Sequence, residues 1–331
     1  MNTPRTLYKG ANVLVTGGLG FIGSNLAIAL VELGAKVTIV DSLIPGHGGN
    51  MFNIEPIKDK VTVNISDMRD SHALRSHVEW KDFIFNLAAQ VSHIDSMEDP
   101  MTDLEINCRS QLSLLETLRA HNPKAFIIYT GTRQVYGKPQ YLPVDEKHPI
   151  DPVDVNGINT MAGEWYHSLY AKVYGMRAVT LRLTNTYGPR QKINNIKLGF
   201  VGTFIKRALQ GETIQLFGDG SQKRDFNEVD DVVEALLLCG EHPELSGDFF
   251  NLGDTAHYSL KEFAELLQKH CRFKLETVPF PPERKRIDIG DYYATYEKFT
   301  KATGWTPKVD LPTGLERTVA YFQKNLSHYL S

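Results

Sequence analysis

The sequence predicts an α/β protein: a Rossmann-type, doubly wound parallel sheet with a smaller C-terminal substrate lobe. Short runs rich in β-branched and aromatic residues alternate with amphipathic helical patterns over the first half of the chain. A glycine-rich turn follows the first of these runs. Beyond residue 186 the alternation becomes irregular, and a proline-rich loop, VPFPPER, interrupts it. The first half therefore predicts the sheet, and the later part predicts the lobe.

Six apolar runs predict the strands of the sheet. Helical patterns such as SNLAIALVELG and MTDLEINCRSQLSLLETLRAH lie between them. Each connecting helix must cover a face of the sheet, so this order predicts parallel strands. We expect residues 1–185 plus about 229–256 to form the Rossmann domain, and 186–228 plus 257–331 to form the lobe. The expected strands are ANVLVT (11–16), KVTIVD (36–41), KVTVNI (60–65), DFIFNLAA (82–89), AFIIYTGT (125–132) and AVTLRLTN (178–185).

The composition excludes several classes of partner. With 42% hydrophobic and 23% charged residues, the 331-residue chain has enough apolar material for a globular core. A net charge of -3 predicts no surface for nucleic acid or an anionic membrane. The three cysteines are widely spaced without a CxxC motif, so neither disulfides nor a metal site are expected. The chain shows no signal-peptide pattern and no membrane-length apolar run, so we expect a cytoplasmic protein.

The turn VTGGLGFIGSNL predicts a dinucleotide site. Gly18, Gly20 and Gly23 fit the GxGxxG pattern between a strand and a helix, and Asp41 ends the next strand 18 residues after Gly23. Glycines allow a tight turn and a close approach of the backbone to a pyrophosphate, whose charge the helix N-terminus near Phe21 favours. Asp41 can accept bonds from the adenosine ribose hydroxyls. Its charge would repel a 2′-phosphate, so NAD is expected rather than NADP.

Several motifs together resemble the extended short-chain dehydrogenase/reductase family. TGGLGFIGSNL, NLAAQVSH, TGTRQVYG, LRLTNTYGPR and GDGSQKRDFNEVDDVVEAL occur in that order, and the chain is most similar to nucleotide-sugar epimerases and dehydratases of the UDP-glucose 4-epimerase type. The resemblance implies bound NAD, a nucleoside diphosphate sugar in the C-terminal lobe, and a homodimer formed by two helices per subunit. The residues it implies for NAD are Gly17, Gly20, Phe21, Ile22, Gly23, Asp41, Asp67, Met68, Leu87, Ala88, Ala89 and Gln90.

The resemblance also implies a catalytic Ser/Thr and a Tyr-x-x-x-Lys helix. Thr132 stands at the Ser/Thr position, four residues before Tyr136. NGINTMAGE falls on the pattern YGxxKxxGE, so Asn156 stands at the Tyr position and Thr160 at the Lys position. Residues four apart share one helical face, where Lys lowers the pKa of Tyr. An amide cannot accept a proton at neutral pH, and Thr160 brings no positive charge. The usual base is therefore absent.

His93, in AAQVSHIDS, is the best-placed alternative base, because histidine titrates near neutrality and this loop borders the sugar in the family that the chain resembles. A histidine in a loop is more often structural, so both roles stay open. Tyr136 and Glu164 are weaker candidates.

Other positions concern the substrate. The sugar 4,6-dehydratases and decarboxylating relatives have an acidic residue two before the VYG tyrosine. Here that position is Gln134, which disfavours both reactions. Arg133 is expected either to bind an anionic or oxygen-rich sugar or to be an exposed residue with loop contacts only.

The diphosphate is expected at Asn185 and Arg224, which match phosphate-holding positions of the resembled family. Asp288 stands where the family often has an arginine, so Arg284 or Arg286 would have to substitute for it.

The expected function is an NAD-dependent nucleotide-sugar epimerase that oxidises a sugar hydroxyl transiently. Two alternatives remain open. One is a catalytically silent protein that binds NAD and a nucleotide sugar, and the other is an NAD-dependent nucleotide-sugar dehydratase with a different base. The nucleotide and the sugar are not encoded in these motifs.

Overall fold

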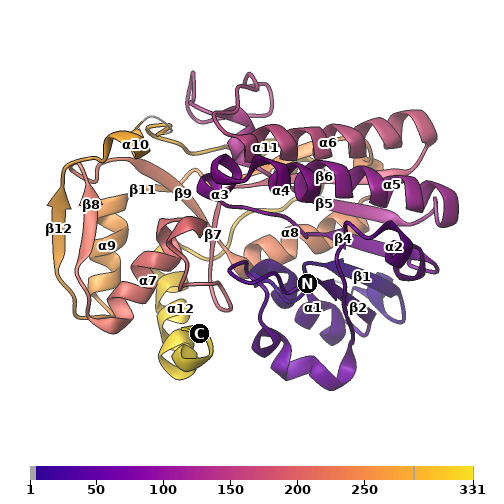
Figure 1. Cartoon of the computed structure of the whole chain (residues 1–331), viewed down its shortest axis with the longest axis horizontal. Helices are drawn as coiled ribbons and strands as arrows, with labels where there is room; N and C mark the ends of the chain where they lie inside the picture. Colours follow the sequence, from indigo (N-terminus) through magenta and orange to yellow (C-terminus); the bar gives the residue numbers. More distant parts are fainter. Residues whose placement is uncertain (1–4, 286–287, 331) are drawn as a thin grey trace.

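A seven-stranded parallel sheet forms the centre of the computed structural model, which describes residues 5–285 and 288–330 (Figure 1). In the order β10-β6-β5-β4-β1-β2-β3, the strands β2 and β3 are added on one side of β1, and the later strands are added on its other side. The winding of the sheet therefore reverses beside β1. All six predicted strands are present, and the predicted fold class is confirmed. The strands are β1 (Asn12–Thr16), β2 (Lys36–Asp41), β3 (Thr62–Ile65), β4 (Phe83–Asn86), β5 (Phe126–Thr132), β6 (Arg177–Leu183) and β10 (Phe249–Leu252).

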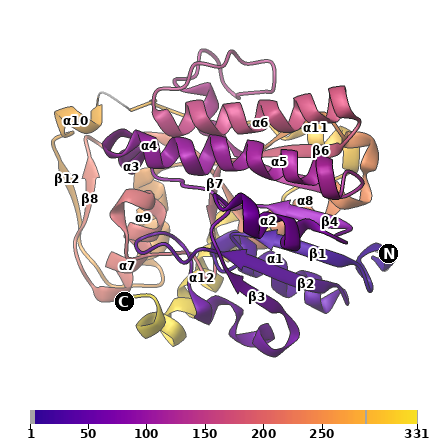
Figure 2. The ribbon, with the colours of Figure 1, turned by 45° about the vertical axis from the view of Figure 1, so that its right-hand side comes forward.

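Helices cover both faces of this sheet. Successive side chains of a strand point to opposite faces, so Val13 and Val15 join one apolar cluster while Leu14 joins another. The first cluster lies under α1 (Phe21–Glu32), α8 (Val229–Glu241) and α11 (Glu297–Thr303). The second lies under α2 (Ser71–Val78), α5 (Ser110–His121) and α6 (Val155–Tyr174), and Figure 2 shows α5 and α6 on the outer side of the sheet. The shorter elements that connect these strands and helices are η1 (Thr6–Tyr8), η2 (Met51–Lys60), α3 (His93–Glu98), α4 (Pro100–Leu104), the π-helical η3 (Glu105–Arg109), η4 (Arg133–Tyr136) and η6 (Pro243–Leu245).

The second group of elements lies beside the sheet, on the left in Figure 1. Its three-stranded sheet has the order β11-β9-β7, and β12 pairs with β8 in a two-stranded sheet. Its own apolar cluster includes Phe204, Phe226, Phe263 and Phe322. The elements are β7 (Asn185–Tyr187), η5 (Ile196–Leu198), α7 (Phe200–Gln210), β8 (Ile214–Phe217), β9 (Lys223–Glu228), β11 (His257–Ser259), α9 (Leu260–Gln268), β12 (Leu275–Val278), α10 (Pro282–Lys285), α12 (Leu311–Asn325) and η7 (Leu326–His328).

Within residues 5–285 and 288–330, no helix has the length and apolarity that a membrane crossing requires. The same part of the chain brings no three His, Cys, Asp or Glu side chains together in a metal-binding group. The cytoplasmic location stays a prediction.

Candidate active site

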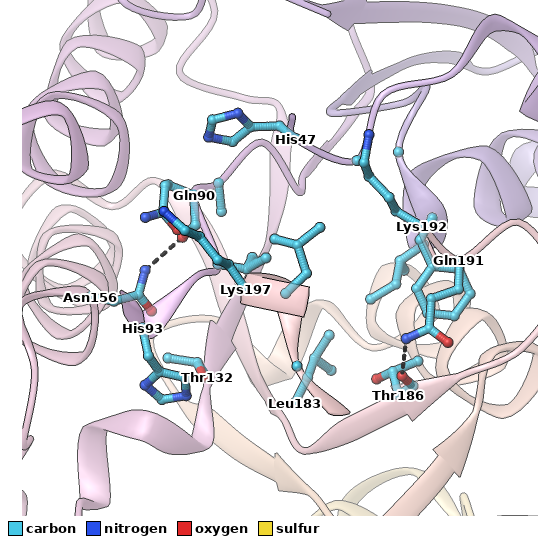
Figure 3. A pocket seen from close by; sticks show the side chains of 18 of the residues that line it. His47, Gln90, His93, Thr132, Asn156, Leu183, Thr186, Gln191, Lys192 and Lys197 are labelled. Atoms are coloured by element: carbon cyan, nitrogen blue, oxygen red, sulfur yellow. Dashed lines mark hydrogen bonds between the residues drawn. The ribbon is translucent and has the colours of Figure 1, made fainter. Parts of the chain in front are cut away.

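A pocket of about 720 Å³ lies where the carboxyl ends of the parallel strands face the second group of elements (Figure 3). In a doubly wound sheet, ligands bind in the crevice beside the strand at which the order reverses. Most of the predicted site residues line this pocket, whereas Gly18, Tyr136 and Glu164 do not, and Arg286 lies outside the described residues. The predicted residues that line it are Gly17, Gly20, Phe21, Ile22, Gly23, Asp41, Asp67, Met68, Leu87, Ala88, Ala89, Gln90, His93, Thr132, Arg133, Gln134, Asn156, Thr160, Asn185 and Arg224.

The glycine-rich turn connects β1 to α1 and forms one end of the pocket. Gly17 has a φ of 66°, a left-handed conformation that favours glycine. A Cβ atom on Gly23 would lie 2.3 Å from the carbonyl oxygen of Gly17, so this position has no room for a side chain. The left-handed residue of the turn is Gly17. A Cβ atom on Gly18 would lie 2.7 Å from Cγ2 of Ile39, so this position is also closely packed.

Asp41 ends β2, as predicted, and its carboxylate holds the glycine-rich turn in place. Oδ2 accepts from the Leu19 amide at 3.0 Å, and Oδ1 accepts from the Leu43 amide at 2.9 Å. Burial raises the pKa of Asp41, while the two amides lower it in part. Each oxygen keeps a second lone pair for a ribose hydroxyl. The turn, the N-terminus of α1 and this carboxylate together fit the pyrophosphate and ribose of NAD.

Thr132 is the last residue of β5, and it lines the pocket. Its hydroxyl oxygen accepts from the Gln134 amide at 3.2 Å, which caps η4. The hydroxyl hydrogen is therefore free to be donated to a ligand oxygen. Gln134 also lines the pocket, so an amide stands where a dehydratase of this type needs an acid.

Asn156 lies in the first turn of α6 and is 2% exposed. Its Nδ2 donates to the carbonyl oxygen of Gln90 at 2.6 Å and to Oδ2 of Asp103 at 3.0 Å. Asp103 is fully buried and also accepts from Asn107 and Asn159, at 3.1 and 2.8 Å. Both amide hydrogens of Asn156 are therefore used, and only its oxygen can serve a ligand. Figure 3 shows that oxygen turned away from Gln90.

Asp103 was missed by the sequence reasoning. It stands four residues before Asn107 in the same helical pattern and 53 residues before Asn156, which lies in another pattern, and no motif marks it. Thr160, one helical turn beyond Asn156, is buried and lines the pocket without supplying a charge.

His93 begins α3, and its Nδ1 is hydrogen-bonded to Oδ2 of Asp154. Asp154 precedes α6 as its N-cap, since Oδ1 accepts from the Gly157 amide at 2.7 Å. Burial raises the pKa of Asp154, but the hydrogen bond with His93 and that with the Gly157 amide outweigh burial and lower it overall. Asp154 was also missed, although an aspartate just before a helical pattern is a recognisable N-cap signal.

Two arginines share the wall of the pocket next to the second group of elements. The Arg133 guanidinium is half-buried and lies 4.9 Å from the centre of the Tyr292 ring, so the prediction of an exposed loop arginine is wrong. Arg224 is almost fully buried and donates from Nη1 to the carbonyl oxygens of Lys223 and Gly290. Burial, together with the nearby charge of Arg133, lowers the pKa of Arg224 to about 10. Arg133 and Arg224 place two cations on one wall of the pocket, which favours an anionic ligand there.

The remaining substrate positions are less directly placed. Asn185 lines the pocket, and its Nδ2 donates to the carbonyl oxygen of Asp225 at 3.0 Å. Asp288 also lines the pocket, and its Oδ1 lies 3.9 Å from Nη2 of Arg224. A carboxylate therefore stands beside the predicted phosphate-binding arginine. The substitute role of Arg284 or Arg286 stays a prediction.

The fold and the glycine-rich turn define a class: NAD-binding proteins of Rossmann type. The chain belongs to the NAD dependent epimerase/dehydratase family, whose model matches residues 13–253. It is 34% identical over 317 residues to a putative UDP-glucose 4-epimerase of Methanocaldococcus jannaschii, covering 95% of this chain and 99% of that protein. The cofactor is NAD.

Two solved structures share the whole architecture. The UDP-glucose 4-epimerase of Thermotoga maritima with UDP-glucose is 31% identical, with a TM-score of 0.86 and coverage of 95% of this chain and 99% of that one. The UDP-glucose 4-epimerase of Thermus thermophilus in complex with NAD is 30% identical, with a TM-score of 0.83 and coverage of 94% and 99%.

Proposed function

We propose that the protein is an NAD-dependent nucleotide-sugar epimerase that oxidises one sugar hydroxyl transiently. The observation that carries this proposal is a single pocket that joins the glycine-rich turn, Thr132 and Arg224. NAD, when bound, accepts a hydride from the sugar carbon and returns it. A carbon that is re-reduced on its opposite face has inverted its configuration, which is the net reaction of an epimerase.

The residues around the reacting oxygen have complementary roles in this proposal. The free hydroxyl hydrogen of Thr132 is donated to the sugar oxygen and stabilises charge that develops there. The oxygen of Asn156, fixed in place by Asp103 and Gln90, accepts from a sugar hydroxyl and orients the ring. This network supports a working site. The two acceptors fix the Asn156 amide, so its oxygen has a defined position from which to bind a ligand. Gln134 disfavours the dehydratase alternative.

A panel of nucleotide sugars tests the proposal against the silent-protein alternative. The purified protein with NAD is mixed with UDP-glucose, UDP-N-acetylglucosamine, UDP-glucuronic acid and CDP-glucose. Binding is measured by calorimetry, and epimer formation by proton NMR. We expect at least one sugar to give its epimer. Binding without product across the panel would identify a catalytically silent protein.

Arg224→Met is expected to weaken binding of the nucleotide sugar. The substitution keeps the buried alkyl stem but removes the charged donors. Loss of a hydrogen bond to a charged group costs about 1.5–3 kcal/mol, or about 10- to 150-fold in Kd. Calorimetry measures this change, and the melting temperature shows whether the fold persists. A Kd within a factor of two of the wild-type value would place the diphosphate elsewhere.

We also propose that the protein is a homodimer, and the outer face of α6 supports this. Ile158, Trp165, Leu169 and Val173 recur at intervals of seven and four residues, and each is about half exposed or more. In Figure 2 this helix lies beside α5 on the outside of the molecule. A contiguous apolar face of this kind is typical of an interface between proteins.

Trp165→Glu is expected to convert the dimer into a monomer at micromolar concentration. A charge in the centre of an apolar interface loses its hydration and finds no partner there. Trp80→Glu is the matched control, because Trp80 is an exposed tryptophan outside α6, between α2 and β4. Analytical ultracentrifugation distinguishes the species. A Trp165→Glu protein that sediments like the control would exclude this interface.

A further inference from the structure

The contact between His93 and Asp154 joins two elements 61 residues apart at the wall of the pocket. The His93 side chain is 37% exposed and lines the pocket, while the Asp154 side chain is 1% exposed behind it. The imidazole therefore reaches the ligand space, and the carboxylate reaches only the imidazole and the N-terminus of α6.

The contacts of the pair define which ring nitrogen of His93 donates. Asp154 also accepts from the Gly157 amide, so both of its oxygens act as acceptors of hydrogen bonds. An ionised carboxylate can only accept, so His93 donates from Nδ1, and in the neutral ring Nε2 carries the free lone pair. This is the arrangement of a base that a second group holds in one tautomer.

We infer that His93 is the catalytic acid–base of this site and that Asp154 is its positioning residue. This inference rests on the proposed function. In the oxidation step, Nε2 of His93 would take the proton of the sugar hydroxyl while the carbon that bears this hydroxyl loses its hydride, so a C=O bond would form; bound NAD would supply the hydride acceptor. Thr132 donates a hydrogen bond to that oxygen. In the reverse step, His93 would return the proton to the oxygen, and the hydride would return to the opposite face of the carbon. The net change is the inversion of that carbon.

The other predicted bases are already engaged. Tyr136 is fully buried, donates to Asn251 at 2.7 Å, and accepts from Arg182 at 2.5 Å; burial raises its pKa to about 12. Glu164 is buried in an ion pair with Arg182, at 2.6 and 2.8 Å. Neither side chain lines the pocket.

Lys197 does line the pocket, but it is paired with Asp95 and Glu98, at 2.8 and 2.6 Å. Its ammonium group is therefore held at α3 by two carboxylates and is charged, which excludes it as a base. His93, by contrast, lines the same pocket as Thr132, and its Nε2 is not engaged by Asp154.

Four variants test the pair on the panel sugar that the wild-type protein converts fastest. His93→Ala is expected to lower kcat by about 10²- to 10⁴-fold with little change in sugar Kd, and added imidazole is expected to restore part of the rate. Asp154→Asn keeps an oxygen for the Gly157 amide, but its amide donates to Nδ1 and leaves the proton on Nε2. We expect a loss of at least about 10²-fold. Asp154→Ser keeps the helix cap without the contact to His93. Asp151→Asn, in the exposed loop before α6, is the matched control and keeps wild-type kcat.

Nitrogen NMR of the histidine ring gives a readout that does not depend on turnover. Wild-type His93 is expected as the Nδ1–H tautomer and Asp154→Asn as the Nε2–H tautomer. Wild-type turnover with an undiminished rate in His93→Ala or Asp154→Asn would overturn the inference and leave the proposed function intact. A wild-type protein without turnover would refute the proposed function and the acid–base role together, whatever the tautomer.

Discussion

Thr132→Val is expected to lower kcat by about 10²- to 10³-fold while the Kd of the nucleotide sugar changes little. Valine has nearly the shape of threonine, so the end of β5 keeps its packing and loses only the hydroxyl. In the proposed reaction that hydroxyl donates to an oxygen whose charge develops during hydride transfer. Removal of one such donor typically costs 10²- to 10³-fold in rate.

Thr132→Ser is the control for this change, because serine retains both the donor and the cap that accepts from the Gln134 amide. We expect Thr132→Ser to stay within about tenfold of the wild-type rate. Steady-state kinetics and the melting temperature measure both variants. Equal rates for the serine and valine variants would remove Thr132 from the reaction.

Gly23→Ala is expected to abolish tight NAD binding. The added methyl group would lie 2.3 Å from the carbonyl oxygen of Gly17 and 2.8 Å from Cα of Gly18. These neighbours are backbone atoms, so the turn or the start of α1 must move. Overpacking of this kind costs about 1–3 kcal/mol or more in stability. It also displaces the amides that face the pyrophosphate.

Gly48→Ala is the matched control, because a Cβ atom there would meet no atom within 4 Å. NAD content after purification and the NAD Kd measure both variants. We expect Gly48→Ala to keep its NAD and Gly23→Ala to lose it. A Gly23→Ala protein that retains NAD would show that the turn does not hold the pyrophosphate.

The sheet and the cofactor end of the pocket could be predicted from the sequence because their signals are local. A run such as KVTIVD shows its strand within six residues, and Asp41 stands at its end. The glycine pattern also lies within one turn. Only the conformation of Gly17 had to be taken from the structure. The consecutive residues Gly17 and Gly18 allow two alignments of the motif, and the backbone conformation decides between them.

The proton-transfer end could not be predicted to the same depth, because its residues meet across long separations in the chain. Asp154 lies 61 residues from His93, and Asp103 lies 53 residues from Asn156. Nothing within a few residues of either acid marks the partner. Asn156 could be identified as unsuited to proton transfer from its chemistry, but the loss of both donors to Gln90 and Asp103 depends on how α6 packs against α4.

The central claim is that this site turns over without the Tyr–Lys pair of the family that it resembles. The network around Asn156 supports the claim, since a tyrosine at this buried position would remove a donor from Asp103. A lysine at Thr160 would place a charge in a buried site. These contacts indicate that the site is adapted to Asn156 and that a tyrosine at this position would not restore a lost activity.

The most direct measurement compares the parent protein with the double variant Asn156→Tyr/Thr160→Lys, under identical conditions, on every nucleotide sugar that the parent binds. Epimer formation is followed by proton NMR, and reduced cofactor by its absorbance. We predict that the parent forms epimer and that the double variant is no faster. A parent that is inactive on every sugar it binds, together with an active double variant, would contradict the claim.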